Sequence, residues 1–368
     1  MDEISLQPAF ASQNEVFASA FAVLQEAIAT CAFPAASLAV TCRGRLVSLK
    51  ALGSFTFEHE IKGNPNPGTL FDLASLTKVV ATTPMAMLLY ERGLLDLDAP
   101  VAGIVPEFVT GAAKDSRRNE VTVRMLLAHC SGLPAYEKLF ARAHTREELL
   151  HAAFAVPLTT EPGSRAEYSD IGFIILGVVL ERVADQTLDY FCRREIFAPL
   201  GMANTVFSPP LNIRPAIPPT ADDKTFRQRI IQGEVQDENA FVLGGVAAHA
   251  GLFSTAEDVA KFAHAMLRGG RPILRPETVA LFTRRESASI DSSRALGWDT
   301  PTTSSQSGKY FSPQSYGHLG YTGTSVWIDP NRQISVTLLT NRTWPGCSNQ
   351  AIKQVRPQFH DAVVAALR

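Results

Sequence analysis

The chain has 368 residues, 46% of them hydrophobic and 19% charged, a composition typical of a soluble globular protein with one large or two ordinary domains. Its formal net charge of −2 provides no basic surface for nucleic acid or for an anionic membrane, so we expect neither as a partner. The five cysteines are odd in number and never spaced as Cys-x-x-Cys, which argues against a disulfide framework and a thiolate zinc site.

The start of the chain, residues 1–3, is acidic and lacks the basic and apolar regions of a signal peptide. The apolar stretch 17–28 contains Glu26, which favours an amphipathic helix over a membrane span. We therefore expect a cytoplasmic protein. A chain from which a leader had been removed would look the same, and would be periplasmic or secreted.

Apolar periodicity and turn residues predict a series of helices and, at both ends of the chain, strands. The predicted helices cover 14–30, 79–89, 121–127, 146–154, 171–184, 188–197, 256–268 and 351–367. The predicted strands cover 37–40, 46–52, 318–321, 325–328 and 334–340. Pro84 should kink the second helix, and Ser254 should cap the helix that begins at Ala256. The proline-dense stretch 209–219 predicts an irregular loop.

Strands at both ends with helices between them predict an α/β (α+β) fold in two parts. Residues 1–70 and 271–368 would form one antiparallel sheet with flanking helices. Residues 71–270 would form a mostly helical lobe inserted into that unit. Clefts between such lobes often hold ligands, so we expect the active site between the two parts.

Ser75 is followed three residues later by Lys78, and the chain contains no other Ser-x-x-Lys. On a helix these positions share a face, so the serine Oγ and the lysine Nζ can meet. The positive end of the helix dipole disfavours an ammonium, and burial disfavours it too, so a neutral Lys78 could take the serine proton. Taken alone, the motif could also be a coincidence of two common residues.

Three short motifs occur in order along the chain: Ser75-x-x-Lys78, Tyr168-Ser169-Asp170 and His318-Leu319-Gly320. They resemble the Ser-x-x-Lys, Tyr-x-Asn and Lys-Thr-Gly elements of the serine β-lactamase and penicillin-binding protein superfamily. The resemblance is strongest to the branch of class C β-lactamases, D,D-peptidases and related esterases. Further familiar runs stand at 129–134, 243–245, 249–254 and 340–341. The resemblance spans nearly the whole chain and implies no metal or organic cofactor.

The resemblance also implies a role for each matching residue. Ser75 would be the nucleophile that becomes acylated, and Lys78 and Tyr168 would be two candidate bases that can share one proton. The residues alone do not decide which of the two holds it. The backbone N–H groups of Ser75 and Tyr321 would form the oxyanion hole. The residues expected to contact the substrate are Asp170, His318 and Gly320.

Two positions depart from the family pattern. Asp170 replaces the usual asparagine, and its charge would disfavour an anionic substrate nearby. His318 replaces lysine and is mostly neutral at pH 7 unless its pKa is shifted, so we expect a weakly cationic wall and a preference for uncharged esters over β-lactams. The run 235–240 resembles Val-His-Asp-Glu-Asn-Ala of cell-wall amidase-like members, but Gln236 replaces the histidine, and the run receives no role.

The sequence thus predicts a serine hydrolase that forms an acyl-enzyme on Ser75 and cleaves a small ester, a peptidoglycan-derived peptide or a β-lactam. The alternative is a penicillin-binding-like module that binds acyl ligands without turnover. Tyr168 and His318 could each also be ordinary packed residues, and His129 and His249 are interpreted as structural. Neither the natural substrate nor the oligomeric state follows from the sequence.

Overall fold

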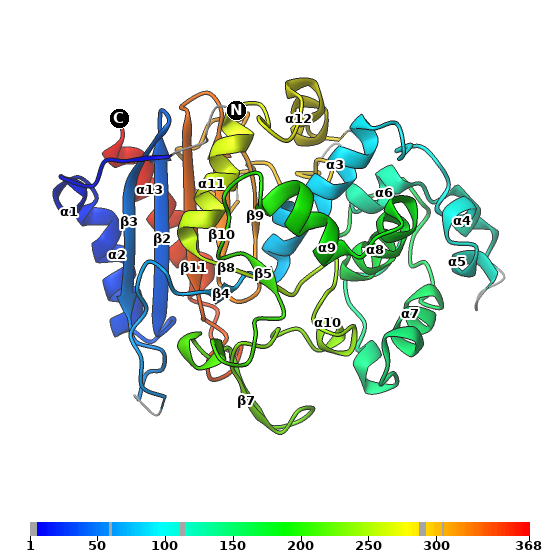
Figure 1. Cartoon of the computed structure of the whole chain (residues 1–368), viewed down its shortest axis with the longest axis horizontal. Helices are drawn as coiled ribbons and strands as arrows, with labels where there is room; N and C mark the ends of the chain where they lie inside the picture. Colours follow the sequence, from blue (N-terminus) through cyan, green and yellow to red (C-terminus); the bar gives the residue numbers. More distant parts are fainter. Residues whose placement is uncertain (1–5, 59–60, 111–114, 287–291, 304) are drawn as a thin grey trace.

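The computed structural model describes residues 6–58, 61–110, 115–286, 292–303 and 305–368. Residues 1–3, on which the expectation of a missing signal peptide depends, lie outside these ranges. The fold is mixed α/β, as predicted. A sheet with flanking helices occupies one side of the molecule in Figure 1, and a helical lobe occupies the other.

The main sheet has six strands in the order β1-β3-β2-β11-β10-β9. Their bounds are β1 (Gln7–Pro8), β2 (Ala35–Cys42), β3 (Arg45–Gly53), β9 (Tyr316–Leu319), β10 (Ser325–Asp329) and β11 (Ile334–Thr340). β11 pairs antiparallel with β2, placing Ile334 opposite Cys42 and Thr340 opposite Ala36. The two ends of the chain therefore share one sheet, which confirms the prediction. The short β1 adds a parallel edge beside β3.

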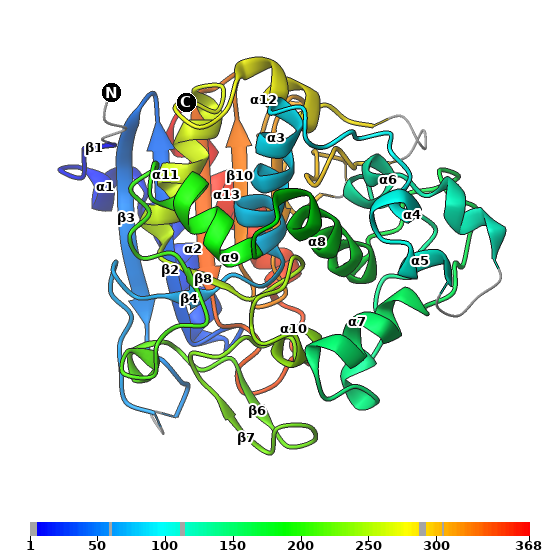
Figure 2. The same ribbon diagram turned by 45° about the vertical axis from the view of Figure 1, so that its right-hand side comes forward.

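Helices cover both faces of this sheet, because successive side chains of a strand point to opposite faces. Leu38 and Val40 of β2 pack into the core beneath α2 (Ala18–Ala29) and α13 (Ile352–Ala366). Ala39 belongs to the core on the opposite face, where α11 (Ala256–Leu267) packs against β2, β10 and β11. Figures 1 and 2 show α11 lying along the sheet, although its residues fall within the predicted helical lobe.

α8 (Asp170–Ala184) lies at the centre of the helical lobe, and its residues from Ile171 to Leu180 are all buried. The other helices on this side are α3 (Thr83–Glu91), α4 (Val101–Ile104), α5 (Glu107–Thr110), α6 (Val123–Leu127), α7 (Arg146–Phe154), α9 (Leu188–Cys192), α10 (Glu238–Val242) and α12 (Pro276–Thr283). Gly177 lets α8 approach a neighbouring segment closely, because a Cβ at this position would lie 2.7 Å from the Cβ of Ala248.

Several local predictions were wrong. The first predicted helix is divided at Phe17 into α1 (Gln13–Val16) and α2. The predicted regular helix 79–89 begins instead with a π-helical turn, Lys78–Thr82, which continues into α3, and Pro84 lies in the first turn of α3.

The capping prediction was also wrong, because Thr255 rather than Ser254 accepts a hydrogen bond from the N–H of Asp258 at the start of α11. Two small sheets were missed. One is formed by β4 (Phe71–Asp72), β8 (Leu252–Ser254) and β5 (Val206–Phe207), and the other is the hairpin of β6 (Ala221–Asp223) and β7 (Arg229–Ile231).

Asn341, directly after β11, joins three segments through its side chain. Its Oδ1 accepts a hydrogen bond from Ala35 N at 3.0 Å, and its Nδ2 donates to Phe55 O at 3.0 Å and Pro219 O at 2.9 Å. The residue is 1% exposed, so water cannot replace these bonds without rearrangement.

Asn341→Ala should therefore lower the free energy of unfolding by about 3 kcal/mol, because buried backbone groups lose their partners. Urea unfolding should show a lower midpoint with an unchanged slope. Asn119→Ala is the matched control, because Asn119 is exposed and makes one local bond to Ser116 O. Equal midpoints for the two variants would contradict the joining role of Asn341.

Candidate active site

Ser75 lies on a 3₁₀ turn, Ala74–Leu76, which begins one residue after β4. It is the partly exposed residue of an otherwise buried run, 71–80. Its side chain lines a cavity of about 670 Å³. The chain thus presents one hydroxyl to this cavity from a segment that is otherwise packed into the core.

Lys78 is fully buried, and its Nζ contacts three oxygen atoms from three segments. They are Ser75 Oγ at 3.1 Å, Asp170 Oδ1 at 2.6 Å and His249 O at 2.9 Å. Burial lowers the pKa of Lys78, and the Asp170 carboxylate opposes this shift. An ammonium can donate to all three atoms, whereas a neutral amine can donate to two and accept the proton of the Ser75 hydroxyl.

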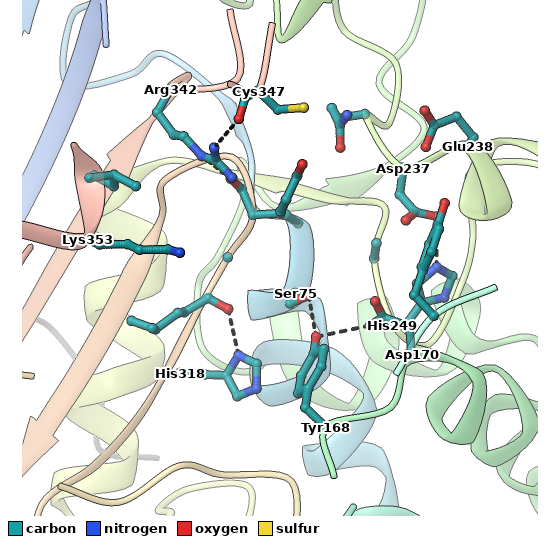
Figure 3. Close-up of a pocket in the computed structure, with 18 of the residues that line it drawn as sticks. Ser75, Tyr168, Asp170, Asp237, Glu238, His249, His318, Arg342, Cys347 and Lys353 are labelled. Atoms are coloured by element: carbon teal, nitrogen blue, oxygen red, sulfur yellow. Dashed lines mark hydrogen bonds and ion pairs between the residues drawn. The ribbon is translucent and has the colours of Figure 1, made fainter. Parts of the chain in front are cut away.

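Tyr168 and Asp170 complete this cluster (Figure 3). Tyr168 Oη lies 2.7 Å from Ser75 Oγ and 3.0 Å from Asp170 Oδ1. Burial and the Asp170 carboxylate raise the pKa of Tyr168 well above its ordinary value. The raised pKa favours the phenol form of Tyr168, which the sequence analysis had left open. Asp170 contacts the two candidate bases and also lines the cavity, so its predicted contact with the substrate stays a prediction.

The start of α8 and a neighbouring histidine hold Tyr168 in place. The Ser169 hydroxyl accepts a hydrogen bond from Gly172 N at 3.0 Å and donates to Pro134 O at 2.7 Å. The N–H of Ser169 donates to Nδ1 of His129 at 3.0 Å. The His129 ring packs against the Tyr168 ring at 4.7 Å between centroids. His129 thus has the structural role that the sequence analysis gave it.

The end of β9 forms another wall of the cavity. Nδ1 of His318 lies 2.8 Å from Leu319 O, and since a carbonyl oxygen only accepts, Nδ1 carries the proton. Burial and the charges of Arg294 and Lys78 lower the pKa of His318 well below its ordinary value. The imidazole is neutral at pH 7, as expected. Gly320 and the half-exposed Tyr321 follow and line the same cavity.

An Asp–His pair lies on the side of Ser75 opposite to His318 (Figure 3). Nε2 of His249 lies 2.9 Å from Asp237 Oδ1, and the same carboxylate oxygen caps α10 through Ala240 N. The His249 side chain is almost fully buried, and its backbone carbonyl is the one that holds Lys78. Figure 3 shows Asp237 and Glu238 on this side of the cavity.

Cationic side chains gather on the side of the cavity that faces α13, where Figure 3 shows Arg342 and Lys353. Arg342 and Arg356 are buried, and their hydrogen bonds go to backbone carbonyls and Gln306. Neither arginine nor Lys353 forms an ion pair with a described residue. Burial lowers the pKa of Arg356 to about 9, so it stays charged at pH 7.

The expectation of a weakly cationic wall holds at His318, and the cations gather instead on the side of the cavity that faces α13. The sequence analysis missed both arginines: Arg342 directly follows the run 340–341 and Arg356 lies on the last helix, but no pattern indicated that their side chains line the cavity. The run 235–240 carried a signal through its family resemblance, but nothing in the sequence paired Asp237 with His249.

Among the described residues, no group of three or more His, Cys, Asp and Glu side chains is arranged to hold a metal ion. The same residues include no helix with the length and apolar character needed to cross a membrane.

The comparisons with known proteins agree on the family. A family model described as Beta-lactamase matches residues 20–356. A protein of Escherichia coli (strain K12) named "Putative D-alanyl-D-alanine carboxypeptidase" is 33% identical, over 84% of this chain and 79% of its own. Its namesake in Salmonella typhimurium is 32% identical, over 87% of this chain and 81% of its own.

Solved structures show the same fold. EstCE1, described as a hydrolase with promiscuous acyltransferase activity, superimposes with a TM-score of 0.78 at 23% identity, covering 96% of this chain and 100% of its own. A penicillin-binding protein homologue from Caulobacter crescentus gives a TM-score of 0.74 at 20% identity, covering 96% and 98%. Because the family model matches most of the length of this chain, the chain belongs to the β-lactamase family.

Proposed function

We propose that this protein is a serine hydrolase that forms an acyl-enzyme on Ser75 and cleaves an ester or amide bond. The observation that carries the proposal is the position of Ser75 Oγ, within hydrogen-bond distance of both Lys78 Nζ and Tyr168 Oη at the wall of a cavity. A nucleophile beside a base is the arrangement that acyl transfer needs.

Lys78 acts as the base in this proposal. As Ser75 Oγ attacks the substrate carbonyl carbon, its proton passes to the amine of Lys78, and the carbonyl electron pair moves onto oxygen. Lys78 becomes an ammonium, whose charge the Asp170 carboxylate balances at 2.6 Å. Tyr168 keeps its proton until the leaving group departs, and then donates it to that group. In the second half, water attacks the acyl carbonyl carbon and gives a proton to the Tyr168 phenolate. The bond to Ser75 Oγ breaks, the Lys78 ammonium returns its proton to that oxygen, and the acid is released.

Ser75→Ala should abolish ester hydrolysis without changing the fold, with a loss on the order of 10⁶-fold, because the nucleophile works as part of a unit. Hydrolysis of p-nitrophenyl butyrate, with circular dichroism as the folding control, measures this. Activity above about a tenth of the wild-type value would exclude the acyl-enzyme mechanism. A wild-type protein that is acylated on Ser75 but never turns over would instead be the acyl-binding module.

Asp170→Asn should move the acid limb of the pH profile of kcat/KM to lower pH by about one unit. The sign follows because Asp170 raises the pKa of Lys78, and without its charge the amine form persists to lower pH. Asp299→Asn, which neutralises another carboxylate lining the cavity, should leave the limb in place. If the acid limb of Asp170→Asn remained at the wild-type pH, Lys78 would not be the titrating base.

The charges of the cavity support a substrate that carries a carboxylate. Arg342 and Arg356 are buried cations without an ion-pair partner among the described residues, and an anion in the cavity would supply one. The names of the E. coli and Salmonella relatives point to D-alanyl-D-alanine peptides, which end in a carboxylate. We therefore propose a short peptide or ester with a terminal carboxylate, in place of the uncharged ester expected from His318.

Lys353→Met should reduce the preference for a carboxylate-bearing ester over its uncharged carboxamide analogue by about fivefold, as expected for a partly exposed charge pair worth about 1 kcal/mol. Lys353 suits this test because it is exposed, lines the cavity and forms no ion pair with a described residue. Lys309→Met, on the surface away from the cavity, is the control. An unchanged ratio of kcat/KM values would count against a carboxylate bound near α13.

A further inference from the structure

The residue that precedes the nucleophile has an unusual backbone conformation. Ala74 has a φ of +47°, in the left-handed region that residues with a Cβ seldom adopt. It is buried, and its N–H donates to Asp72 Oδ1 at 2.8 Å. A carboxylate that accepts from the N–H two residues on stabilises such a turn. Asp72 therefore sets the direction in which the chain enters Ser75.

The second carboxylate oxygen of Asp72 holds another segment. Oδ2 accepts a hydrogen bond from Gln236 N at 2.7 Å, and the Gln236 carbonyl is held in turn by Arg227 at 2.7 Å. Asp72 is 2% exposed, and burial raises its pKa to about 6. The N–H groups of Ala74 and Gln236 supply the hydrogen bonds that water would give to an exposed carboxylate. An asparagine has one side-chain oxygen and could not satisfy both donors in this way.

The backbone of the same segment is tied to the turn between β9 and β10. Thr322 Oγ1 donates to Asp72 O at 2.8 Å, and Thr324 Oγ1 donates to Leu73 O at 2.9 Å. The two segments touch at Gly320, where a Cβ would lie 2.5 Å from Leu73 O. This turn carries Tyr321, the second proposed oxyanion donor. These hydrogen bonds hold the turn that carries Tyr321 against Asp72 and Leu73, the residues that lead to Ser75.

We propose that Asp72 is a positioning residue for the oxyanion hole: its carboxylate acts on the N–H of Ser75 through Ala74, and its backbone carbonyl, held by Thr322, places the turn that bears the N–H of Tyr321. The inference rests on the proposed acyl-transfer function. When Ser75 Oγ bonds to the carbonyl carbon, the carbonyl oxygen becomes an anion that the two N–H groups stabilise. Asp72 exchanges no proton in this step. Its carboxylate fixes the approach to the first donor, and its backbone carbonyl anchors the turn that carries the second.

The test compares an ester with the thionoester of the same acid and alcohol, in full-length protein. Sulfur accepts hydrogen bonds more weakly than oxygen, so the ratio of the two kcat/KM values reports on the oxyanion hole. In Asp72→Asn, kcat/KM should fall about 10²-fold for the ester and less than about threefold for the thionoester, as the loss of an oxyanion donor would. Misplacing an oxyanion donor affects chiefly the substrate whose carbonyl atom is oxygen. If the role of Asp72 were merely structural, kcat/KM would fall equally for both substrates.

Thr322→Val provides a second test that leaves the buried carboxylate in place, so it addresses the hole even where Asp72→Asn fails to fold. It should lower the oxygen-to-sulfur ratio about tenfold or more, as the loss of alignment of one donor would. Thr337→Val is the matched control: Thr337 is a buried strand threonine whose hydroxyl has no hydrogen-bond partner among the described residues.

The outcomes separate this inference from the proposed function. An active wild type whose ratio is unchanged in both Asp72→Asn and Thr322→Val overturns the positioning role alone. A wild type that hydrolyses neither substrate contradicts the proposed hydrolase, and the positioning role with it. A ratio that falls in Thr337→Val as much as in Thr322→Val would also overturn it, because any buried hydroxyl would then have the same effect.

Discussion

The burial of Lys78 is the constraint on which the site depends. A lysine without contact to water needs acceptors for its N–H groups, and leaving one unmet costs about 1–3 kcal/mol. The acceptors come from the turn before it, from the start of α8 and from the segment that leads into β8. Packing these three segments together therefore also brings Ser75 beside Lys78, and a shift of any of them would leave the lysine without one of its acceptors.

Asp170 shows how one substitution in a familiar motif changes the electrostatics of such a site. A neutral amide at this position could accept from Lys78 but could not balance an ammonium. The carboxylate does so, while it also accepts from Tyr168 and keeps that phenol protonated. The charge is paired with Lys78 inside the cluster, although Asp170 also lines the cavity. The arginines on the side that faces α13 are the cations that we propose to bind a substrate carboxylate.

Much of the site could be predicted from motif order, although the local structure around it could not. Ser75 and Lys78 meet at 3.1 Å even though a 3₁₀ turn and a π-helical turn replace the expected regular helix. The terminal strands were predictable because they are long enough to show a hydrophobic pattern. β4, β5 and β8 have two or three residues each, too few for any periodicity to be visible. The division of the chain at residues 70 and 270 stays a prediction.

Side-chain direction was the part that the sequence could not supply. Asp170 follows Tyr168 by two residues, yet whether it points to the substrate or to Lys78 depends on how α8 begins. Arg356 projects from the C-terminal helix into a cavity whose nucleophile lies 281 positions earlier in the chain. Such convergence is a property of the tertiary packing, and no local pattern of residues around Arg356 indicates it.

The position of β9 at the edge of the main sheet has a consequence for what can associate with this protein. An open edge strand invites pairing with another chain. Here the backbone groups of Gly317 are already engaged by Asp299. Because backbone groups alternate between the two sides of a strand, Leu319 is the next residue whose N–H faces away from β10. The contact with Asp299 thus covers part of the edge, and the N–H of Leu319 faces away from β10 in a residue that lines the cavity.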